Sequence, residues 1–209
     1  NKLHKKGQGS INKEDFSKII KFIGRKNILD SHEFFYRFRE KKLKPRDVCL
    51  TFDDGIKSQY DIALPVLEDL KIKSFFFIAS STLGENPDLL EVYRYFRTNY
   101  FNDIDQFYDQ FYKILDKDLN SFFKDNEKEI SNLKKKFSHY SLNDIKFRLV
   151  RGNVLGKDEY HKLMEKMFKE KKFNYKNYYK ILFLNEKNLK KINELGHLIG
   201  LHSHSHPTK

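Results

Sequence analysis

The sequence predicts an α/β fold, with short parallel strands separated by helices. Three apolar runs, at 48–52, 74–79 and 197–201, have the length and composition of buried strands. The first two, with a helix between them, form a βαβ unit, so these two strands should be parallel. Polar motifs follow the first and third runs, and sites of this kind form at the carboxyl rim of α/β barrels. We therefore expect the N-terminal part of a (β/α) barrel.

Two helices are expected before the first strand. Residues 12–15 have the form of a capping box, and apolar residues follow at helical spacing as far as Gly24. A second helix should begin near Asp30 or Ser31. It is expected to bury an apolar stripe of three aromatic residues, Phe34, Phe35 and Phe38.

The first strand, 48–52, is cut short by Asp53, Asp54 and Gly55. The glycine allows the backbone to turn sharply, which leaves the two acids at the end of the strand. Adjacent carboxylates repel each other, so burying both requires a compensating charge such as a metal ion. The single cysteine, Cys49, cannot form a disulfide within the chain and is expected to be a small buried hydrophobe.

A helix over 58–70 should connect the first two strands, with Pro65 marking a kink or a shifted start. From 82 to 184 the sequence predicts a helical insertion between the second and third strands. Its helices are expected at 91–96, 104–115, 120–137, 142–150 and 157–169. Their aromatic stripe should be a packing face, and the alternative is that a few rings stack on carbohydrate.

A last helix, capped by Asn185 and ended by Gly196, leads into the third strand. That strand delivers a histidine-rich stretch to its C-terminal end. Imidazole and carboxylate form a common mixed ligand set for zinc and related divalent metals. His202 and His206 are four residues apart and would face the same way on a helical turn. We expect His197 to be structural and His204 to lie on the surface.

Two motifs resemble those of a known family. Thr51-Phe52-Asp53-Asp54-Gly55 resembles the first motif of the polysaccharide deacetylases (NodB-like, carbohydrate esterase family four), and residues 202–207 resemble their second. The resemblance covers roughly 48–80 and 185–208, and more loosely the helical segment between them. It implies a distorted barrel with fewer than eight strands. Residues 1–209 would be the N-terminal portion of one such domain, with 82–184 as an insertion.

The resemblance also implies roles for individual residues. Asp54, His202 and His206 would hold a divalent metal, Zn²⁺ first among the candidates, and Asp53 would be the general base. The reaction would remove N- or O-acetyl groups from a carbohydrate, as in members associated with bacterial surface polysaccharides or their precursors. The family's later motifs, including its general acid, have no counterpart before Lys209, so the sequence given is expected to lack the acid.

The alternative function is a catalytically inactive relative that binds carbohydrate or regulates. The intact set of acids and histidines argues against it. A relative that no longer binds metal would be expected to lose at least one ligand, because buried acids without a counter-charge are costly. The formal net charge is +12, but lysines are spread over most helical stretches, so we expect solvated faces and no nucleic-acid partner. No apolar run is long enough to span a membrane. A cytoplasmic location is favoured, with a periplasmic or envelope-associated one left open, as is the oligomeric state.

Overall fold

Three parallel strands form the sheet, in the order in which they occur along the chain: β1 (Thr51–Asp53), β2 (Phe75–Ala79) and β3 (Leu198–Ser203). The structure is a computed structural model that describes residues 10–84 and 89–204. The α/β class and the parallel pairing of the first two strands are confirmed. Within the described residues the sheet has three strands and does not close into a barrel.

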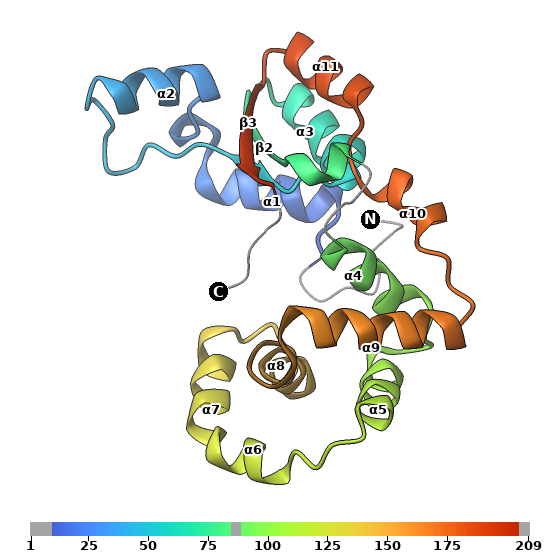
Figure 1. Cartoon of the computed structure of the whole chain (residues 1–209). Coiled ribbons are helices and arrows are strands. Elements are labelled where there is room, and N and C mark those ends of the chain that lie inside the picture. Colours follow the sequence, from blue (N-terminus) through green and yellow to red (C-terminus); the bar gives the residue numbers. More distant parts are fainter. Residues whose placement is uncertain (1–9, 85–88, 205–209) are drawn as a thin grey trace.

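Three helices pack against one face of this sheet: α1 (Lys13–Ile23), α3 (Leu64–Asp69) and α11 (Glu186–Glu194) (Figure 1). Successive side chains of a strand point to opposite faces, so Phe76 and Ile78 of β2 share the helix-covered face. Both are buried and belong to one core with Phe16 and Ile20 of α1, Leu67 of α3 and Ile192 of α11. This core fixes the strand ends that carry the site.

Gly200 of β3 lies beside Phe77, its partner in the register. A Cβ atom at position 200 would lie 2.7 Å from two carbons of the Phe77 ring. Phe77 also stacks on Phe75, with 5.6 Å between the ring centroids. The absence of a side chain at Gly200 therefore lets these two half-buried rings lie flat over the second face of the sheet.

The long connection from β2 to β3 forms a helical part with its own core. Its helices are α4 (Leu90–Asn99), α5 (Ile104–Leu115), α6 (Asn120–Asp125), α7 (Glu127–Lys136), α8 (Leu142–Leu149), α9 (Gly156–Glu170) and α10 (Lys176–Leu182). Figure 1 shows α4 and α10 between the sheet and the other helices. Phe96, Phe107, Phe111 and Phe147 are fully buried there, so the prediction that the aromatic stripe is a packing face is confirmed.

Two expectations about the N-terminal region were wrong in detail. Helix α2 (Ser31–Arg39) exists, but Phe35 and Phe38 are exposed rather than buried, because only Phe34 of the stripe reaches a sheet ring, that of Phe75. The regular part of the first strand begins at Thr51 rather than at residue 48. Before it, Val48 bridges to Ile28, and the Leu50 carbonyl accepts a hydrogen bond from the backbone N–H of Phe75 in β2. Cys49, between them, is half-buried.

Two helical stretches contain π-helical segments that the sequence did not reveal. The helix expected over 58–70 begins as a π-helical turn, Gln59–Ala63, and becomes α-helical at Leu64, next to Pro65. Proline has no backbone N–H, so it fits the first turn of an α-helix and shifts its start, as expected. Between the helices expected at 142–150 and 157–169, the chain likewise forms a π-helical segment, Val150–Leu155, that joins α8 to α9.

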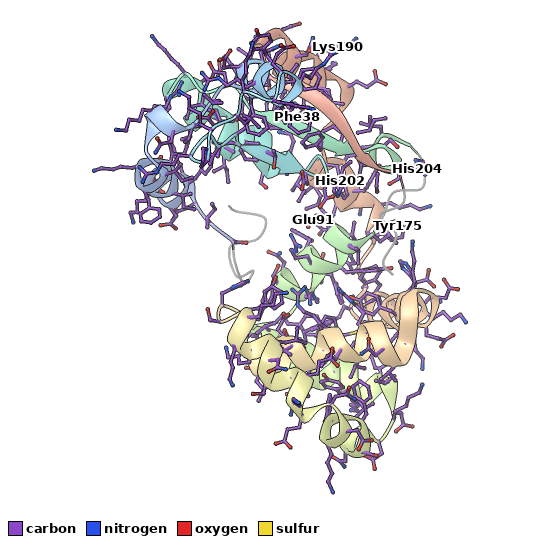
Figure 2. The ribbon with its side chains drawn as sticks, turned by 90° about the vertical axis from the view of Figure 1, so that its left-hand side faces the viewer. Phe38, Glu91, Tyr175, Lys190, His202 and His204 are labelled. Atoms are coloured by element: carbon purple, nitrogen blue, oxygen red, sulfur yellow. The ribbon has the colours of Figure 1, made fainter. Side chains whose placement is uncertain are left out.

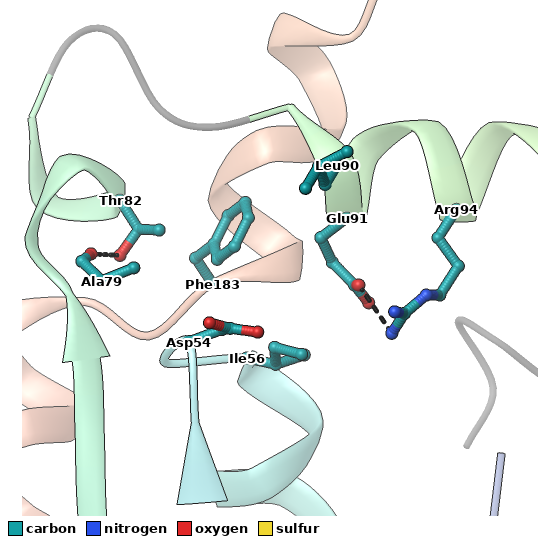
Figure 3. A pocket seen from close by; sticks show the side chains of 8 residues that line it. All are labelled: Asp54, Ile56, Ala79, Thr82, Leu90, Glu91, Arg94 and Phe183. Carbon is teal, nitrogen blue, oxygen red and sulfur yellow. Dashed lines mark hydrogen bonds and ion pairs between the residues drawn. The ribbon is translucent and has the colours of Figure 1, made fainter. Parts of the chain in front are cut away.

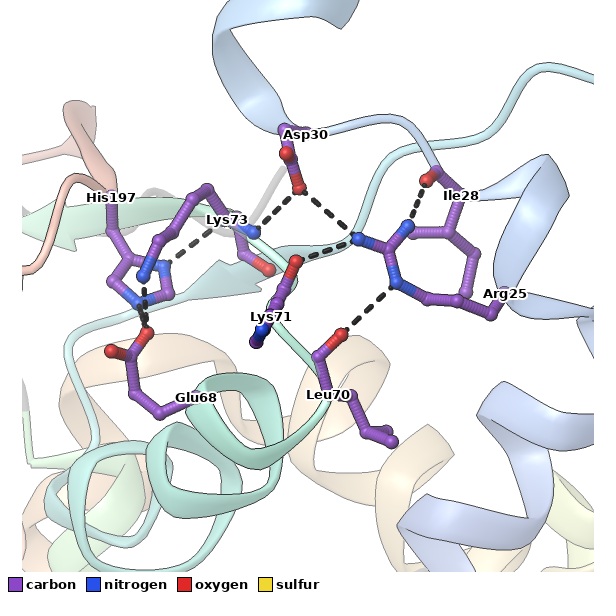
Figure 4. Close-up of polar contacts among 9 residues, drawn as sticks. Arg25, Ile28, Asp30, Glu68, Leu70, Lys71, Lys73 and His197 are labelled. Carbon is purple, nitrogen blue, oxygen red and sulfur yellow. Dashed lines mark hydrogen bonds and ion pairs between the residues drawn. The ribbon is translucent and has the colours of Figure 1, made fainter.

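His197 joins β3 to β2 and to α3 (Figure 4). Its Nδ1 accepts a hydrogen bond from the backbone N–H of Ser74 at 3.0 Å. Nδ1 is therefore unprotonated, and Nε2 donates to Glu68 Oε1 at 3.1 Å. With its side chain buried between these partners, His197 has the structural role expected for it.

Candidate metal centre

A tight turn after β1 sets the position of Asp54. Asp54 and Gly55 both adopt the left-handed backbone region, with φ of 71° and 68°. Aspartate tolerates this region better than most side chains, and glycine has no side chain to resist it. A Cβ atom on Gly55 would also meet the Ile78 side chain at 3.3 Å. The turn therefore ends the strand at Asp53 and leaves Asp54 at the carboxyl rim of the sheet.

Asp54 and His202 meet at this rim although they lie far apart in the sequence. The distance from His202 Nε2 to Asp54 Oδ1 is 3.5 Å, and about a third of each side chain is exposed. This distance exceeds the roughly 2.7–3.2 Å of a good N–H···O hydrogen bond. Two ligands that bind zinc at about 2.0–2.2 Å, at a tetrahedral angle, lie about 3.4 Å apart. The pair is therefore spaced like two ligands of one metal ion.

Of the other two predicted site residues, the structure describes only Asp53. His206 lies outside the described residues. Asp53 is exposed at the last position of β1, paired in the register with Phe77. His204 is exposed, as expected, with its Nδ1 3.0 Å from Ser80 Oγ. Among the residues that the structure describes, no group of three or more His, Cys, Asp or Glu side chains is arranged so that it could hold a metal ion.

The helical turn expected from His202 to His206 falls mostly on residues outside the described part of the chain and stays a prediction. His202 lies inside β3, which continues alongside β2 as far as the pairing of Ser203 with Ala79. A register shift between Ile78 and Ala79 accompanies this extension. His202 is the extra residue at this shift, between Leu201, which pairs with Ile78, and Ser203, which pairs with Ala79. Figure 2 shows it at the end of the sheet that faces Glu91 of α4.

A cavity of about 120 Å³ opens beside Asp54 (Figure 3). Its apolar lining comes from Ile56, Ala79, Leu90 and Phe183, and its polar lining from Asp54, Thr82, Glu91 and Arg94. The sheet and the helical part thus contribute opposite walls. Among the described residues that line the cavity, Asp54 is the only one of the predicted site residues.

Glu91 and Arg94 are the polar residues of this cavity that the sequence did not reveal. They form an ion pair with 3.0 Å between Arg94 Nη1 and Glu91 Oε2. The Glu91 side chain is 8% exposed and that of Arg94 is 52% exposed. The spacing of an acid and a base three residues apart is common on helices, so nothing in the sequence linked this pair to Asp54.

Comparison with known proteins gives a family match for one part of the chain. Residues 40–96 match the family model described as polysaccharide deacetylase. This segment is just over a quarter of the chain and contains β1, Asp54 and Glu91, but not His202. The match suggests a hydrolase that acts on amide or ester bonds of an acetylated carbohydrate. No curated protein and no solved structure matches the chain.

The helices were also assessed for membrane insertion. No helix within the described residues has both the length and the apolar character that crossing a bilayer requires.

Proposed function

We propose that this chain carries the metal ligands and the general base of a metal-dependent carbohydrate deacetylase. The spacing of Asp54 and His202 is the main support, because it suits two ligands of one divalent ion better than a direct hydrogen bond. The family match over 40–96 supports the same reaction class independently of His202. His206 is the proposed third ligand, and zinc the proposed metal. When bound, the ion would supply the positive charge that activates water and polarises the acyl carbonyl.

The chain's own residues would perform two further tasks. Asp53, exposed beside the ligand Asp54, would take the proton of the attacking water as general base. The cavity beside Asp54 would take the acyl group, since its apolar side chains suit a methyl group. At about 120 Å³ it is smaller than the roughly 300–1,000 Å³ of pockets that enclose drug-sized ligands. The rest of the carbohydrate would therefore lie outside it.

The finer assignment is also a proposal. We place the chain with the NodB-like deacetylases, and we propose that its three parallel strands belong to a distorted barrel of that type. The substrate would be an N- or O-acetylated bacterial surface polysaccharide or its precursor. The long helical insertion favours this choice over compact extracellular members. An inactive, carbohydrate-binding relative is the second candidate.

Metal content tests the proposal most directly. Purified wild type, dialysed after exposure to zinc, should hold near-stoichiometric zinc by elemental analysis. Asp54→Asn and His202→Ala should each lose most of it, because each removes one ligand. His204→Ala is the matched control, since it removes a neighbouring exposed imidazole that contacts Ser80 rather than Asp54.

The results separate the two candidate functions. Zinc retained by wild type and His204→Ala, together with acetate release from acetylated chitin oligomers or acetylated surface glycans, supports the enzyme. Zinc uptake without acetate release from any of these favours the binding relative. If wild type takes up no zinc, or Asp54→Asn and His202→Ala hold as much as wild type, the proposed centre is wrong.

A further inference from the structure

Three arginines converge on one carboxylate inside the helical part, away from the candidate metal centre. Arg97 comes from α4, Arg148 from α8 and Arg151 from the π-helical segment that follows. The carboxylate is Asp144 of α8, whose side chain is 5% exposed. We call these four residues the arginine cluster.

The cluster is built into the aromatic core. Arg97 lies over Phe147, with 4.9 Å from the guanidinium carbon to the ring centroid, and Arg151 lies 6.0 Å from the same centroid. Arg148 is ion-paired with Asp144 and lies over Tyr140. Asp144 also accepts a hydrogen bond from the hydroxyl of Tyr108 at 2.9 Å. These contacts hold the cationic groups in fixed positions.

Arg97 is the least satisfied member of the cluster. Its side chain is 11% exposed, and Nη1 lies 3.8 Å from Asp144 Oδ1, which is too far for a hydrogen bond. Within the described residues, Nε and Nη1 of Arg97 are buried without a hydrogen-bond partner, as is the hydroxyl of Tyr112. Stacking on an aromatic face leaves the in-plane N–H groups of a guanidinium unused, so packing alone does not account for them.

The positive and negative charges of the arginine cluster do not balance. Two guanidinium groups, those of Arg97 and Arg148, lie against the Asp144 carboxylate, and that of Arg151 lies beside the Phe147 ring. The cluster thus has three positive charges and one negative charge, so two positive charges lack a counter-charge among its members. Burial lowers the pKa of Arg151, and the charges of Arg148 and Arg97 act in the same direction, whereas Tyr160 and Asp144 act in the opposite one. Buried charge of one sign is costly, and an anion would relieve it.

We propose that the arginine cluster binds a small dianionic oxyanion, the phosphate or sulfate group of a ligand. A dianion matches the two uncompensated positive charges. Its oxygens can accept from the N–H groups of Arg97, because the planar guanidinium fork suits phosphate and sulfate. The side chain of Arg148, 37% exposed, gives the cluster a solvent-facing side through which the ion can enter.

Calorimetric titration of metal-free protein with inorganic phosphate and with sulfate tests this proposal. Metal is removed so that anion binding at Asp54 and His202 does not contribute. Both dianions should bind one per chain, whereas acetate at the same ionic strength should bind at least tenfold more weakly. Arg97→Met should weaken phosphate binding at least tenfold, because it removes the unpaired donors but keeps an apolar stem.

Arg39→Met is the matched control. Arg39 is an exposed arginine with its guanidinium carbon 6.0 Å from the Phe35 ring centroid, so this change also removes a stacked positive charge, but outside the cluster. It should bind phosphate as wild type does. Arg148→Gln, at a half-exposed position, provides a second cluster variant if Arg97→Met does not fold.

The proposal would be overturned by an absence of saturable phosphate or sulfate binding in wild type. Equal loss of binding in Arg39→Met and a cluster variant would overturn it too, since that pattern indicates general attraction to a basic surface. Saturable binding that survives Arg148→Gln or Arg97→Met unchanged would place the ion elsewhere. Loss confined to the cluster variants supports the site, and the relative affinities of phosphate and sulfate identify the preferred group.

Discussion

At the scale of single residues, His197 shows how a buried polar side chain stabilises the sheet. Its ring contacts β2 through Ser74, α3 through Glu68, and the edge of the Phe76 ring at 5.4 Å. Burial lowers the pKa of His197, although the hydrogen bond and charge of Glu68 act in the opposite direction. The charges of Lys73 and Asp30 also act on it, with opposite signs. The folded protein therefore favours the neutral imidazole.

This protonation preference predicts an acid-dependent loss of stability. The unfolded chain binds the proton near the ordinary pKa of about 6.5, whereas the folded chain binds it only at lower pH. Stability contributed by His197 is thus present above about pH 6.5 and is lost as the pH falls below it. His197→Gln, which cannot titrate, should be less stable than wild type by about 1–3 kcal/mol at pH 7.5.

Urea unfolding of both proteins between pH 7.5 and pH 5 tests this prediction. The difference in free energy of unfolding between wild type and His197→Gln should shrink toward pH 5. Staying above pH 5 avoids the titration of Glu68. Burial would raise the pKa of Glu68, but its contacts with Lys73 and His197 hold it below the ordinary value. A difference that is constant or grows as the pH falls would contradict the stated role of His197.

At the scale of residues, the sequence pointed to candidates whose signal is local. Asp54 was identified because an acid pair and a glycine end an apolar run, and His202 because histidines follow another. Glu91 and Arg97 were missed, since their importance depends on which distant side chains they meet. Each lies on α4 at an ordinary helical position. Such meetings depend on how the helical part packs, and helical spacing does not specify that packing.

At the scale of elements, α11 has the best-defined N-terminus of the chain's helices. Asn185 accepts from the backbone N–H of Asn188, and the Asn188 side chain accepts in return from the backbone N–H of Asn185. This capping box satisfies two backbone donors that would otherwise lack partners. After α11, residues 195–197 lead into β3, the strand that carries His202 to the rim.

Removing this cap should destabilise the protein measurably. Asn185→Ala is expected to lower the free energy of unfolding by about 1 kcal/mol, with a range of about 0.5–2. Asn193→Ala is the matched control on the same helix, at an exposed position, and should be neutral or slightly stabilising because alanine favours helix. Chemical denaturation of both variants measures the difference. Equal effects of the two substitutions would show that the capping box contributes nothing.

Prediction of the elements succeeded at the helix ends. It failed where tertiary contacts determine which side chains are buried and which segments pair. The starts of α1 and α11 follow from Asn12 and Asn185, whose side chains cap the backbone locally. The aromatic stripe of α2 had helical spacing but no sheet surface to cover beyond Phe75. Likewise, the strand at 48–52 was expected from its apolar character, whereas the partner available to Val48 was Ile28 rather than β2. Spacing predicts an element, but its neighbours decide what it buries.

At the scale of the whole molecule, the chain has two main hydrophobic cores. One joins the sheet to α1, α3 and α11, and the other lies within the helical part. Phe183 belongs to the helical core and Leu184 to the sheet core, so adjacent residues mark the junction. Asp54 and His202 both come from the sheet part, whereas Glu91 and Arg94 reach the cavity from the helical part. Asp54 and His202 thus belong to the sheet part, although Ile56, two residues after Asp54, forms an isolated bridge with Phe183 of the helical core.

This division predicts that the two parts respond separately to core damage. Leu67 of α3 and Met164 of α9 are each fully buried, one in each core. Truncating either to alanine should cost about 2–5 kcal/mol. Met164→Ala should speed amide hydrogen exchange in the helical part while exchange in β1 to β3 stays near wild type. Leu67→Ala should do the reverse, because each cavity lies in its own core.

Zinc content of the same two variants links this division to the proposed centre. Met164→Ala should retain zinc, since Asp54 and His202 both come from the sheet part and Met164 lies in the other core. Leu67→Ala should bind zinc more weakly, because α3 supports the sheet whose strand ends carry both ligands. If either variant accelerates exchange throughout the chain, the two cores unfold as one unit. In that case loss of zinc in both variants would follow, and the helical part would be a structural requirement of the centre rather than only one wall of its cavity.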